Sequence, residues 1–333
     1  MSPPFVTVLI DTFNYGHFVE EAIESVLAQD FPREQREILV VDDGSTDDTA
    51  ERLKKYGDSL RYLRKSNGGQ ASAFNYGFAA ARGEVIATLD ADDLWMPGKL
   101  RRVCEVFEKT PEAGMVYHRT HLWRGGEQLE NDSYFVEVSG RVPASRASLL
   151  RYPMVGTSCL AFRRSALELV LPVPEALRSQ ADAYLTALII FVAPVVALPE
   201  FLAKYRLHGA NLFQYGEDNP AAKSIEHRMA MRAELLLGVK RWLEGNGSLS
   251  SPDVQDYLKQ WTSAQEADGF KLHKPSRWKY FLHLRDVVRV HGELLSPRHR
   301  TYLLAQAYAA LILGYSHLHI LDALRRGRKT KGS

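Results

Sequence analysis

The chain has 333 residues, with 42 lysine and arginine residues against 40 aspartate and glutamate residues, and a formal net charge of +2. This balance excludes the basic footprint of a nucleic-acid-binding protein, and the length suffices for one or two hydrophobic cores. Cys104 and Cys159 lie in apolar surroundings, which favours a reducing compartment and gives no disulfide framework. Met1 runs almost directly into a strand pattern, so we expect no signal peptide and a cytoplasmic protein.

The first ninety residues alternate between apolar strand patterns and helix patterns. The predicted strands cover 6–10, 37–41 and 84–89, and the predicted helices cover 18–29, 49–56 and 71–81. Strands that alternate with helices form a parallel sheet, because right-handed crossovers return the chain to the same sheet. The sequence therefore predicts an α/β fold.

Polar residues follow each of these strands. The first strand leads into Asp11-Thr12-Phe13-Asn14, the second into Asp42-Asp43-Gly44-Ser45, and the third into Asp90-Ala91-Asp92-Asp93. In an open α/β sheet the ligand binds beyond the carboxyl ends of the strands, so we expect these segments to meet. Crowded carboxylates repel one another unless a cation neutralises them, and Mg2+ is usually held by carboxylates plus substrate phosphates. The pattern therefore predicts a nucleotide site that holds a divalent metal.

Some of these residues also have a purely structural interpretation. Asp93 is equally well placed to cap a following helix. Gly68 and Gly69 follow Asn67 in a turn before the third predicted helix. They would let the backbone turn beside a ligand, but an ordinary turn explains them nearly as well.

The ordered set of motifs resembles the family 2 inverting glycosyltransferases. These have the GT-A fold, a Rossmann-like, mostly parallel mixed sheet flanked by helices. The resemblance covers about two thirds of the chain, and an ordered set is far more specific than any single motif. It rests on segments at 8–14, 22–29, 40–47, 67–69 and 90–93. One departure is Asp11, where the family more often has proline, and it leaves the strand end intact.

The resemblance implies a nucleotide-diphosphate sugar as the donor, with a UDP-sugar favoured. It also implies a Mn2+ or Mg2+ ion that stabilises the departing diphosphate as a Lewis acid. The implied metal residues are Asp92, Asp90 and His208. The implied nucleotide-sugar-binding residues are Thr12, Asn14, Asp42, Asp43, Asn67, Gly68, Asp90 and Arg206. A sugar nucleotidyltransferase is less favoured, because it would more usually carry a glycine-rich, basic loop after the first strand.

Two of the assignments in the later segment have alternatives. His208 follows a strand-like stretch, and without the resemblance a lone histidine there would be read as a satisfied structural residue. With the resemblance it could bind the metal or touch the diphosphate, and Arg206 could pair with phosphate oxygens.

An inverting transfer needs a general base for the acceptor hydroxyl, and a carboxylate commonly serves. The candidate is Asp182, at the start of an apolar helical run that extends to Phe191. The family usually has an acidic pair here, whose second acid is the base, whereas this chain has Ala181 before Asp182. Asp182 could instead only favour a helix N-terminus. The missing acid also leaves open a catalytically inactive GT-A-fold binding or scaffold protein.

The chain changes character after about residue 215, as its composition shifts to long helical patterns. We expect a catalytic domain over 1–215 and a helical region over 216–333, with helices at 221–244, 253–265, 276–290 and 297–325. The stretch 301–321 carries no charged residue, with histidines counted as neutral, and basic residues flank it. It predicts a helix that packs on protein, lies on anionic lipid or spans a membrane.

The resemblance also implies an acceptor and a cellular setting. The acceptor would be a hydroxyl of a glycan or lipid-linked glycan, and the process would be bacterial envelope polysaccharide synthesis. We therefore expect a cytoplasmic protein, with peripheral association at the inner face of the plasma membrane if the last helix meets lipid.

Overall fold

The computed structural model describes residues 5–129, 135, 137–143, 156–209, 211, 225–272, 276–291, 301, 303–305 and 307–308. The chain packs as two compact units, which are Met1–Ala222 with Leu237–Leu249, and Lys223–Leu236 with Ser250–Ser333. The predicted boundary at 215–216 falls outside the described residues, so the division into 1–215 and 216–333 stays a prediction.

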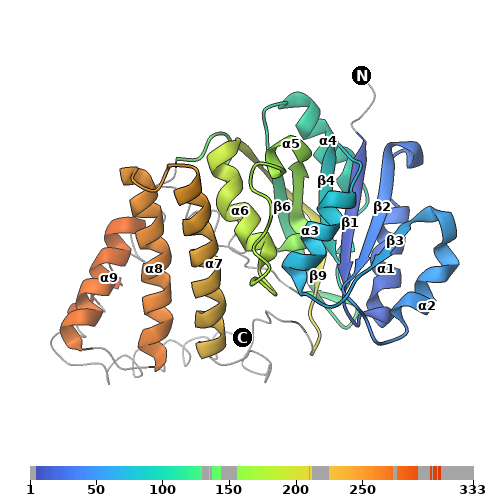
Figure 1. The fold of residues 1–333 in the computed structure, drawn as a ribbon. Helices are drawn as coiled ribbons and strands as arrows, with labels where there is room; N and C mark the ends of the chain where they lie inside the picture. Colours follow the sequence, from blue (N-terminus) through green and yellow to red (C-terminus); the bar gives the residue numbers. More distant parts are fainter. Residues whose placement is uncertain are drawn as a thin grey trace. The chain divides into compact units, whose positions relative to one another are not determined.

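A nine-stranded mixed sheet organises the described part of the first unit (Figure 1). Its strands are β1 (Val6–Thr12), β2 (Arg36–Asp42), β3 (Arg61–Arg64), β4 (Val85–Asp90), β5 (Leu94–Trp95), β6 (Met115–Arg124), β7 (Glu127–Leu129), β8 (Leu160–Arg163) and β9 (Val195–Arg206). The order is β3-β2-β1-β4-β8-β6-β9-β5, and β7 pairs with β6. Strands β1 to β4 are parallel, whereas β8 runs antiparallel to both of its neighbours. The predicted mixed, mostly parallel sheet is confirmed.

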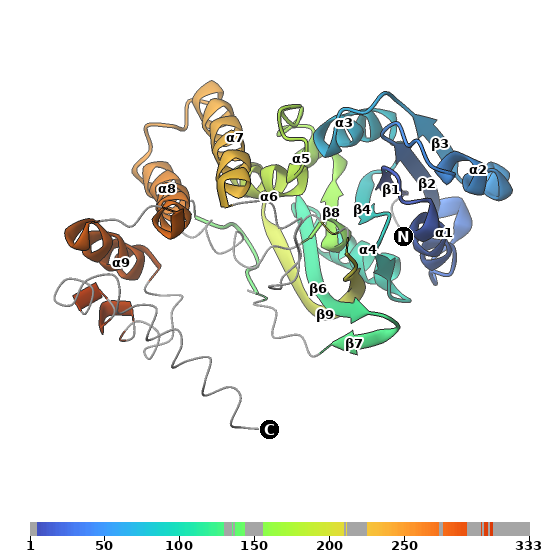
Figure 2. The same ribbon diagram turned by 90° about the horizontal axis from the view of Figure 1, so that it is seen from below.

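Helices cover both faces of this sheet. They are α1 (Gly16–Leu27), α2 (Thr49–Leu53), α3 (Gln70–Ala80), α4 (Lys99–Lys109), α5 (Arg164–Leu167) and α6 (Ala181–Val192). The helix predicted over 49–56 ends at Leu53 and continues as 3-10 turns over Lys54–Ser59, where Gly57 has a φ of +47°. Figure 2 shows α3 and α6 on one side of the sheet and α1 and α4 on the other.

The core explains why each face attracts its helices. Val6, Val8 and Ile10 of β1 are fully buried in a cluster with residues of α1 and α4. Leu9 points to the opposite face, because successive strand residues alternate. There a methyl group at Gly77 of α3 would lie 2.5 Å from the Leu9 Cδ1 atom, so this glycine lets α3 pack directly on β1. Each such aliphatic side chain contributes roughly 1.5–3 kcal/mol when fully buried.

Longer helices follow the sheet in the chain. They are α7 (Ile225–Gly245), α8 (Pro252–Leu272) and α9 (Arg277–His291), close to three of the predicted helices. No helix among the described residues is long and apolar enough to cross a membrane. The predicted helix at 297–325 lies almost wholly outside the described residues, so its three interpretations stay predictions.

Candidate functional site

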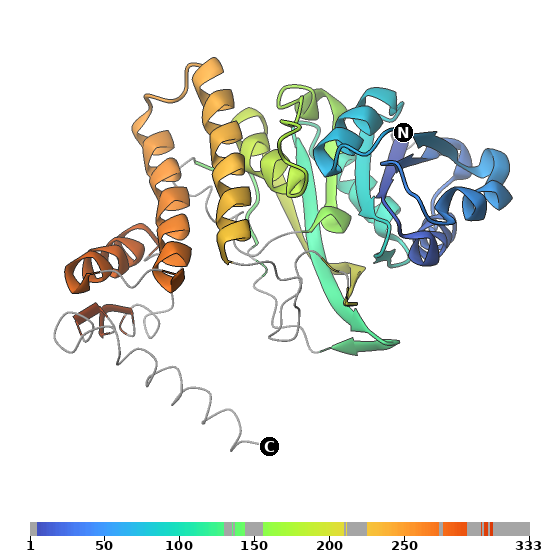
Figure 3. The same cartoon turned by 60° about the horizontal axis from the view of Figure 1, so that its bottom comes forward.

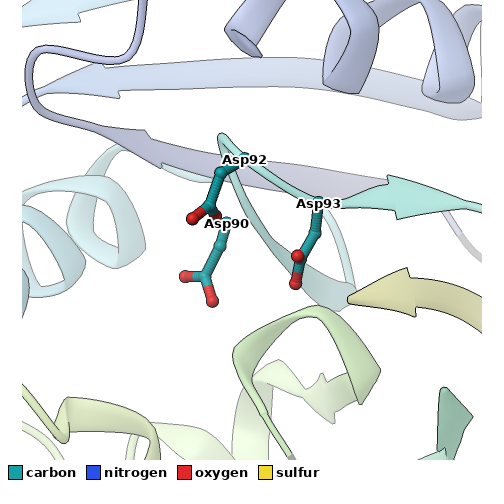
Figure 4. Close-up of side chains that lie close together, drawn as sticks. All are labelled: Asp90, Asp92 and Asp93. Atoms are coloured by element: carbon teal, nitrogen blue, oxygen red, sulfur yellow. The ribbon is translucent and has the colours of Figure 1, made fainter. Parts of the chain in front are cut away.

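The three polar strand ends meet, as the sequence predicted. β1 lies between β2 and β4, and the register places Thr12 beside Asp42 and Asp11 beside Asp90. One carboxylate oxygen from each of Asp90, Asp92 and Asp93 lies within 4.8 Å of the others. Figure 4 shows these three side chains at the end of β4 and in the turn that follows it.

Burial and mutual repulsion dominate the electrostatics of this turn. Burial raises the pKa of Asp90 well above its usual value, and repulsion from Asp11 and Asp92 adds to it. Burial also raises the pKa of Asp11 to about 7, with repulsion from Asp92, Asp182 and Asp43. The Oδ1 atom of Asp11 is buried without a hydrogen-bond partner in the described structure. A bound cation would lower these pKa values, because it stabilises the ionised carboxylates.

Asp93 does not cap a helix, so that interpretation is wrong. The strand β5 follows it, and α4 begins only at Lys99. The Ser158 hydroxyl donates to Asp93 Oδ2 at 2.6 Å, and the Arg206 backbone N–H donates to Asp93 Oδ1 at 2.9 Å. Asp93 therefore ties β9 and the segment before β8 to the acidic turn.

The segment after β9 folds back onto Asp92. The His208 Nε2 atom lies 2.9 Å from Asp92 Oδ2, and the Asn211 side-chain amide lies 3.5 Å from the same oxygen. Asn211 also donates to the Arg206 carbonyl at 2.9 Å and accepts from the His208 backbone N–H at 2.5 Å. The structure thus brings together the three residues predicted for the metal, Asp90, Asp92 and His208.

Arg206 lies beside the acidic turn, but its donors are engaged by the protein. Its Nε atom donates to the Asp92 carbonyl at 2.9 Å, and its Nη2 atom pairs with Glu21 at 2.7 Å. Its guanidinium carbon lies 4.8 Å from the centre of the Phe18 ring. The Glu21 side chain is 55% exposed, so this pair is the contact that a phosphate could replace.

Asp43 organises the glycine turn. It accepts from the backbone N–H of Gly68 at 2.9 Å and of Gly69 at 2.6 Å, and from the Lys65 ammonium at 2.8 Å. The Asn67 amide donates to the Asp43 carbonyl at 3.0 Å. The predicted residues Asp43, Asn67 and Gly68 therefore form one hydrogen-bonded unit at the end of β2.

Asp42 and Asn14 shape the neighbouring loops. Asp42 is fully buried and accepts from the Ser45 N–H at 2.7 Å and from the Tyr62 hydroxyl. Asn14 has a φ of +57°, and its Oδ1 atom accepts from the Thr46 N–H at 2.7 Å. The hydroxyl of Thr12 is buried and, among the described residues, has no hydrogen-bond partner, so a ligand group could satisfy it.

Asp182 lies in the first turn of α6 and is half-buried. Burial raises the pKa of its carboxyl. The Thr157 hydroxyl donates to Asp182 Oδ2 at 3.4 Å, and the Gln70 amide donates to Thr157 Oγ1 at 3.3 Å. The Gln70 side-chain oxygen, Oε1, accepts from the Ala181 N–H at 3.0 Å. Gln70, at the start of α3, therefore positions the beginning of α6.

Several residues that build the site carried no signal in the sequence. Lys99 is fully buried, donates to the Ser158 carbonyl at 2.6 Å, and lies 3.7 Å from the centre of the Trp95 ring. Burial lowers its pKa well below the usual lysine value. In the sequence, Lys99 follows Pro97 and Gly98 and is typical of a solvent-exposed residue at a helix start. Ser158 lies in an apolar stretch and has no feature that indicates a functional role. Asn211, three residues after His208, carries no feature that marks its contact with Asp92.

Comparisons with known proteins agree with this geometry. The chain matches the family model described as Glycosyl transferase family 2 over residues 7–171. An uncharacterised glycosyltransferase of Nostoc sp. is 37% identical over 215 residues, which is 62% of this chain and 66% of the relative. One of Rickettsia felis is 30% identical over 62% of this chain and 34% of its own length. The chain thus spans less than two thirds of these relatives.

Solved structures show the same fold. Staphylococcus aureus TarS residues 1–349 in complex with UDP-GlcNAc has a TM-score of 0.63 at 19% identity, covering 98% of this chain and 92% of that chain. The mannosyltransferase PcManGT from Pyrobaculum calidifontis in complex with GDP-Man and Mn2+ has a TM-score of 0.51 at 19% identity, covering 94% and 88%. The sheet, its flanking helices and the acidic turn after β4 define a GT-A fold of the glycosyltransferase class. The chain belongs to glycosyl transferase family 2.

Proposed function

We propose that this chain is a metal-dependent, inverting glycosyltransferase. It moves a sugar, favoured to be a hexose, from a nucleotide-diphosphate sugar, with a UDP-sugar favoured, to a hydroxyl of a glycan or lipid-linked glycan. The observation that carries the proposal is the group of Asp90, Asp92 and Asp93 at the junction of three strand ends. TarS structures with UDP and UDP-GlcNAc, and PcManGT with GDP-Man and Mn2+, support this donor class.

The residues present fit a hard divalent cation. Their carboxylate oxygens are the ligands that Mn2+ and Mg2+ accept, and the histidine beside Asp92 adds a nitrogen. Asp11 Oδ1 lies buried nearby and, among the described residues, is unsatisfied. Asp92 and Asp90, with His208, would hold the ion. When bound, the ion supplies positive charge for the departing diphosphate.

The nucleotide would bind where the other strand ends meet. Thr12 offers a buried hydroxyl, and Asp42 and Asp43 fix the loops that would enclose the base and ribose. Asn14, Asn67 and Gly68 complete these loops. Arg206 would exchange its Glu21 partner for a phosphate oxygen.

Asp182 is the proposed base. The acceptor hydroxyl oxygen attacks the anomeric carbon as the bond from that carbon to the diphosphate oxygen breaks. The hydroxyl proton passes to an Asp182 carboxylate oxygen. Attack opposite the leaving group inverts the configuration. The raised pKa of Asp182 suits this task, because a base works best when its pKa approaches the working pH.

Nucleoside diphosphate release with a panel of UDP- and GDP-sugars, with and without Mn2+, tests the proposal. We expect metal-dependent release with one donor, and Asp182→Asn should lower the rate of transfer by about 100-fold or more while donor binding persists. Glu51→Gln is the matched control, since Glu51 is an acid in the first turn of α2 with a 73% exposed side chain. Nucleotide binding without release under every condition would favour the inactive binding or scaffold protein.

The remaining parts of the proposal concern the setting. The residues assigned to donor, metal and base all lie within 1–215, the proposed catalytic domain. The proposed helical region, 216–333, would associate with the membrane surface or pack on protein through its last helix. Synthesis of an envelope polysaccharide in the cytoplasm, at the inner face of the plasma membrane, follows as the proposed context.

A further inference from the structure

Two neighbouring strands bring cations and aromatic rings together on one face of the sheet. In the β6–β9 register Arg119 lies beside Phe201, and His121 lies beside Lys204. The His121 and Phe201 rings stack with centres 4.1 Å apart at an interplanar angle of 5°. The Arg119 guanidinium carbon lies 4.1 Å from the centre of the Phe201 ring. The Lys204 ammonium lies 4.0 Å from the centre of the Trp123 ring. We name these five residues the β6–β9 patch.

Arg119, at one end of the patch, lies on the face of β6 opposite the cluster with α1 and α4. Val116 of β6 is buried in the cluster with α1 and α4. Because side chains alternate along a strand, Tyr117 points the other way. Tyr117 and Arg119 both contact the Phe135 ring, at 5.6 Å between ring centres and at 5.9 Å from the guanidinium carbon. Arg119 therefore lies on the same side of the sheet as Tyr117, and Figure 2 shows α6, which carries the proposed base, on the side of the sheet opposite α1 and α4.

The patch also extends from the donor site. Trp123 is the register partner of Arg206, whose guanidinium group donates to the Asp92 carbonyl. Figure 3 shows β6 as a long strand that continues from the sheet into β7. A molecule lying along this part of β6 would therefore have one end close to the acidic turn.

Within the described part of the chain, the cations of the patch have no acidic partner. Among the described residues neither Arg119 nor Lys204 forms an ion pair, and the Arg119 Nε atom is buried without a hydrogen-bond partner. Burial lowers the pKa of His121, and repulsion from Lys204 and Arg119 lowers it further. An acid is close in sequence, since Glu200 precedes Phe201, but Glu200 pairs with Arg102 at 2.7 Å. Half-buried guanidinium donors without acceptors are costly unless a ligand supplies the acceptors.

The aromatic contacts hold these cations in place and leave their N–H groups available to an anion. A ring face holds a guanidinium or ammonium group through the ring quadrupole and uses none of its N–H donors. The donors of Arg119 and Lys204 thus stay available for phosphate or carboxylate oxygens. Trp123, which is half-buried, adds an apolar surface of the kind that packs against a sugar ring.

We propose that the β6–β9 patch binds the acceptor, and that the acceptor is an anionic glycan. The inference rests on the proposed function, because it assigns the patch to the acceptor of that reaction. The shared chemistry is a sugar-containing chain with negative oxygens, supplied either by phosphodiesters or by uronic-acid carboxylates. The diphosphate of the donor would bind at a separate site, at the ends of the strands.

Binding of three oligosaccharide probes to the full chain tests the patch directly. The probes are glycerol-phosphate oligomers, oligogalacturonates and neutral dextran oligosaccharides of matched length, each titrated by calorimetry. We expect binding of one or both anionic probes, weakened by added salt because the charges are partly exposed, and none of the neutral probe. The anionic probe that binds identifies the source of the charge. Equal binding of the neutral probe, or binding of none, would overturn the proposal.

Variants assign this binding to the patch. Arg119→Gln with Lys204→Gln should weaken anionic binding about tenfold or more, because each removes a charge-assisted contact. Lys204→Gln alone is the second variant, in case the double variant folds poorly. Arg124→Gln is the matched control, an exposed cation at the end of the same strand. Unchanged affinity in a folded Lys204→Gln and double variant would overturn the assignment.

Donor hydrolysis separates this proposal from the proposed function. The patch variants should keep the wild-type rate of donor hydrolysis to nucleoside diphosphate in the absence of acceptor, and should raise only the KM for acceptor. Anionic binding by a chain that hydrolyses no donor would leave the patch standing and reject the transferase. Donor turnover with a raised donor KM in the variants would reject the patch as an acceptor site.

Discussion

The His208 Nε2 atom lies 2.9 Å from the Asp92 Oδ2 atom, although the two residues are 116 positions apart in the sequence. The contact joins the end of β9 to the turn after β4, and Asn211 supports it from the same segment. The Asp92 carboxylate and the His208 imidazole thus lie side by side, next to Asp90. The first prediction, on metal-dependent nucleotide binding, follows from this arrangement.

Replacement of Asp92 by asparagine should remove the metal-dependent part of nucleotide binding. At a ligand concentration of 100 Kd, binding to the native state stabilises a protein by about 2.7 kcal/mol. We therefore expect UDP with Mn2+ to raise the Tm of the wild-type chain, and a chelator to abolish the rise. Asp92→Asn should show little rise, whereas the exposed control Asp58→Asn should behave as wild type. An undiminished rise in Asp92→Asn would place the ion elsewhere.

The pH dependence of turnover should report the ionisation of Asp182. The base must be ionised, and burial raises the pKa of this carboxyl. We expect kcat to fall as the pH drops through a pKa above the ordinary aspartate value of about 3.9. Initial rates at saturating donor and acceptor, from about pH 4 to about pH 9, would locate this limb. Asp182→Asn should lower kcat by about 100-fold or more. A variant that keeps both the rate and the limb would show that another group is the base.

The same carboxyl should make the fold less stable at neutral pH. Because its pKa is raised in the folded state, the wild-type chain loses stability as the pH rises from the unfolded-state value of about 3.9 through the folded-state value. Asp182→Asn lacks this loss, so it should be the more stable protein at neutral pH and should lose that advantage in acid. Urea unfolding at two pH values would measure the difference. Greater stability of the wild type at neutral pH would contradict the prediction.

Gly69 should tolerate no side chain. It has a φ of +86°, and a methyl group there would lie 2.6 Å from the Arg178 Cα atom. Gly57 is the matched control, with a φ of +47° and no atom within 4 Å of such a methyl group. Gly57→Ala should cost about 1–3 kcal/mol through backbone strain alone, and Gly69→Ala about 1–3 kcal/mol more through overpacking. Equal free energies of unfolding would show that Arg178 moves aside freely.

Asp43→Ala should destabilise the fold far more than the loss of an exposed acid. The Asp43 side chain is 5% exposed, pairs with Lys65, and holds the N–H groups of Gly68 and Gly69. Breaking a buried pair costs about 3–5 kcal/mol. Asp48→Ala, which removes an ion pair with Arg52 from a 57% exposed side chain, should cost about 1 kcal/mol or less. Denaturant unfolding of both variants would measure this contrast, and similar costs would contradict it.

The sheet and its acidic edge were predictable because their signals are local. Apolar runs mark the strands, and the rule that parallel strands end at one edge brings Thr12, Asp42 and Asp90 together without any knowledge of contacts. The role of Asp93 was missed because it depends on Ser158, which lies 65 positions away. The helix for which Asp93 was one possible cap starts later, because Met96 first donates to the Leu202 carbonyl at 2.9 Å and the chain then turns at Gly98.

Lys99 and Gln70 are two further residues whose contacts with distant segments could not be predicted from the sequence. Nothing adjacent to Lys99 indicates that its ammonium group ends beneath the Trp95 ring, because the Ser158 carbonyl that receives it belongs to a distant segment. Gln70 directly follows the glycine turn and has no distinguishing neighbours in the sequence, yet its side chain contacts Thr157 and Ala181. Polar residues that support others are identifiable only once the fold has placed their partners.

The glycine turn that Asp43 holds is also hydrogen-bonded to the segment that precedes α6. The Gln70 N–H donates to the Arg178 carbonyl at 2.9 Å, and the Gln70 side chain reaches Ala181. We predict that a nucleoside bound at this turn shifts the start of α6, which carries the Asp182 carboxylate, because Gln70 joins the two segments. We expect the nucleotide to adjust the position of the proposed base, Asp182, before the acceptor binds. This gives a physical reason for the two substrates to bind in a fixed order.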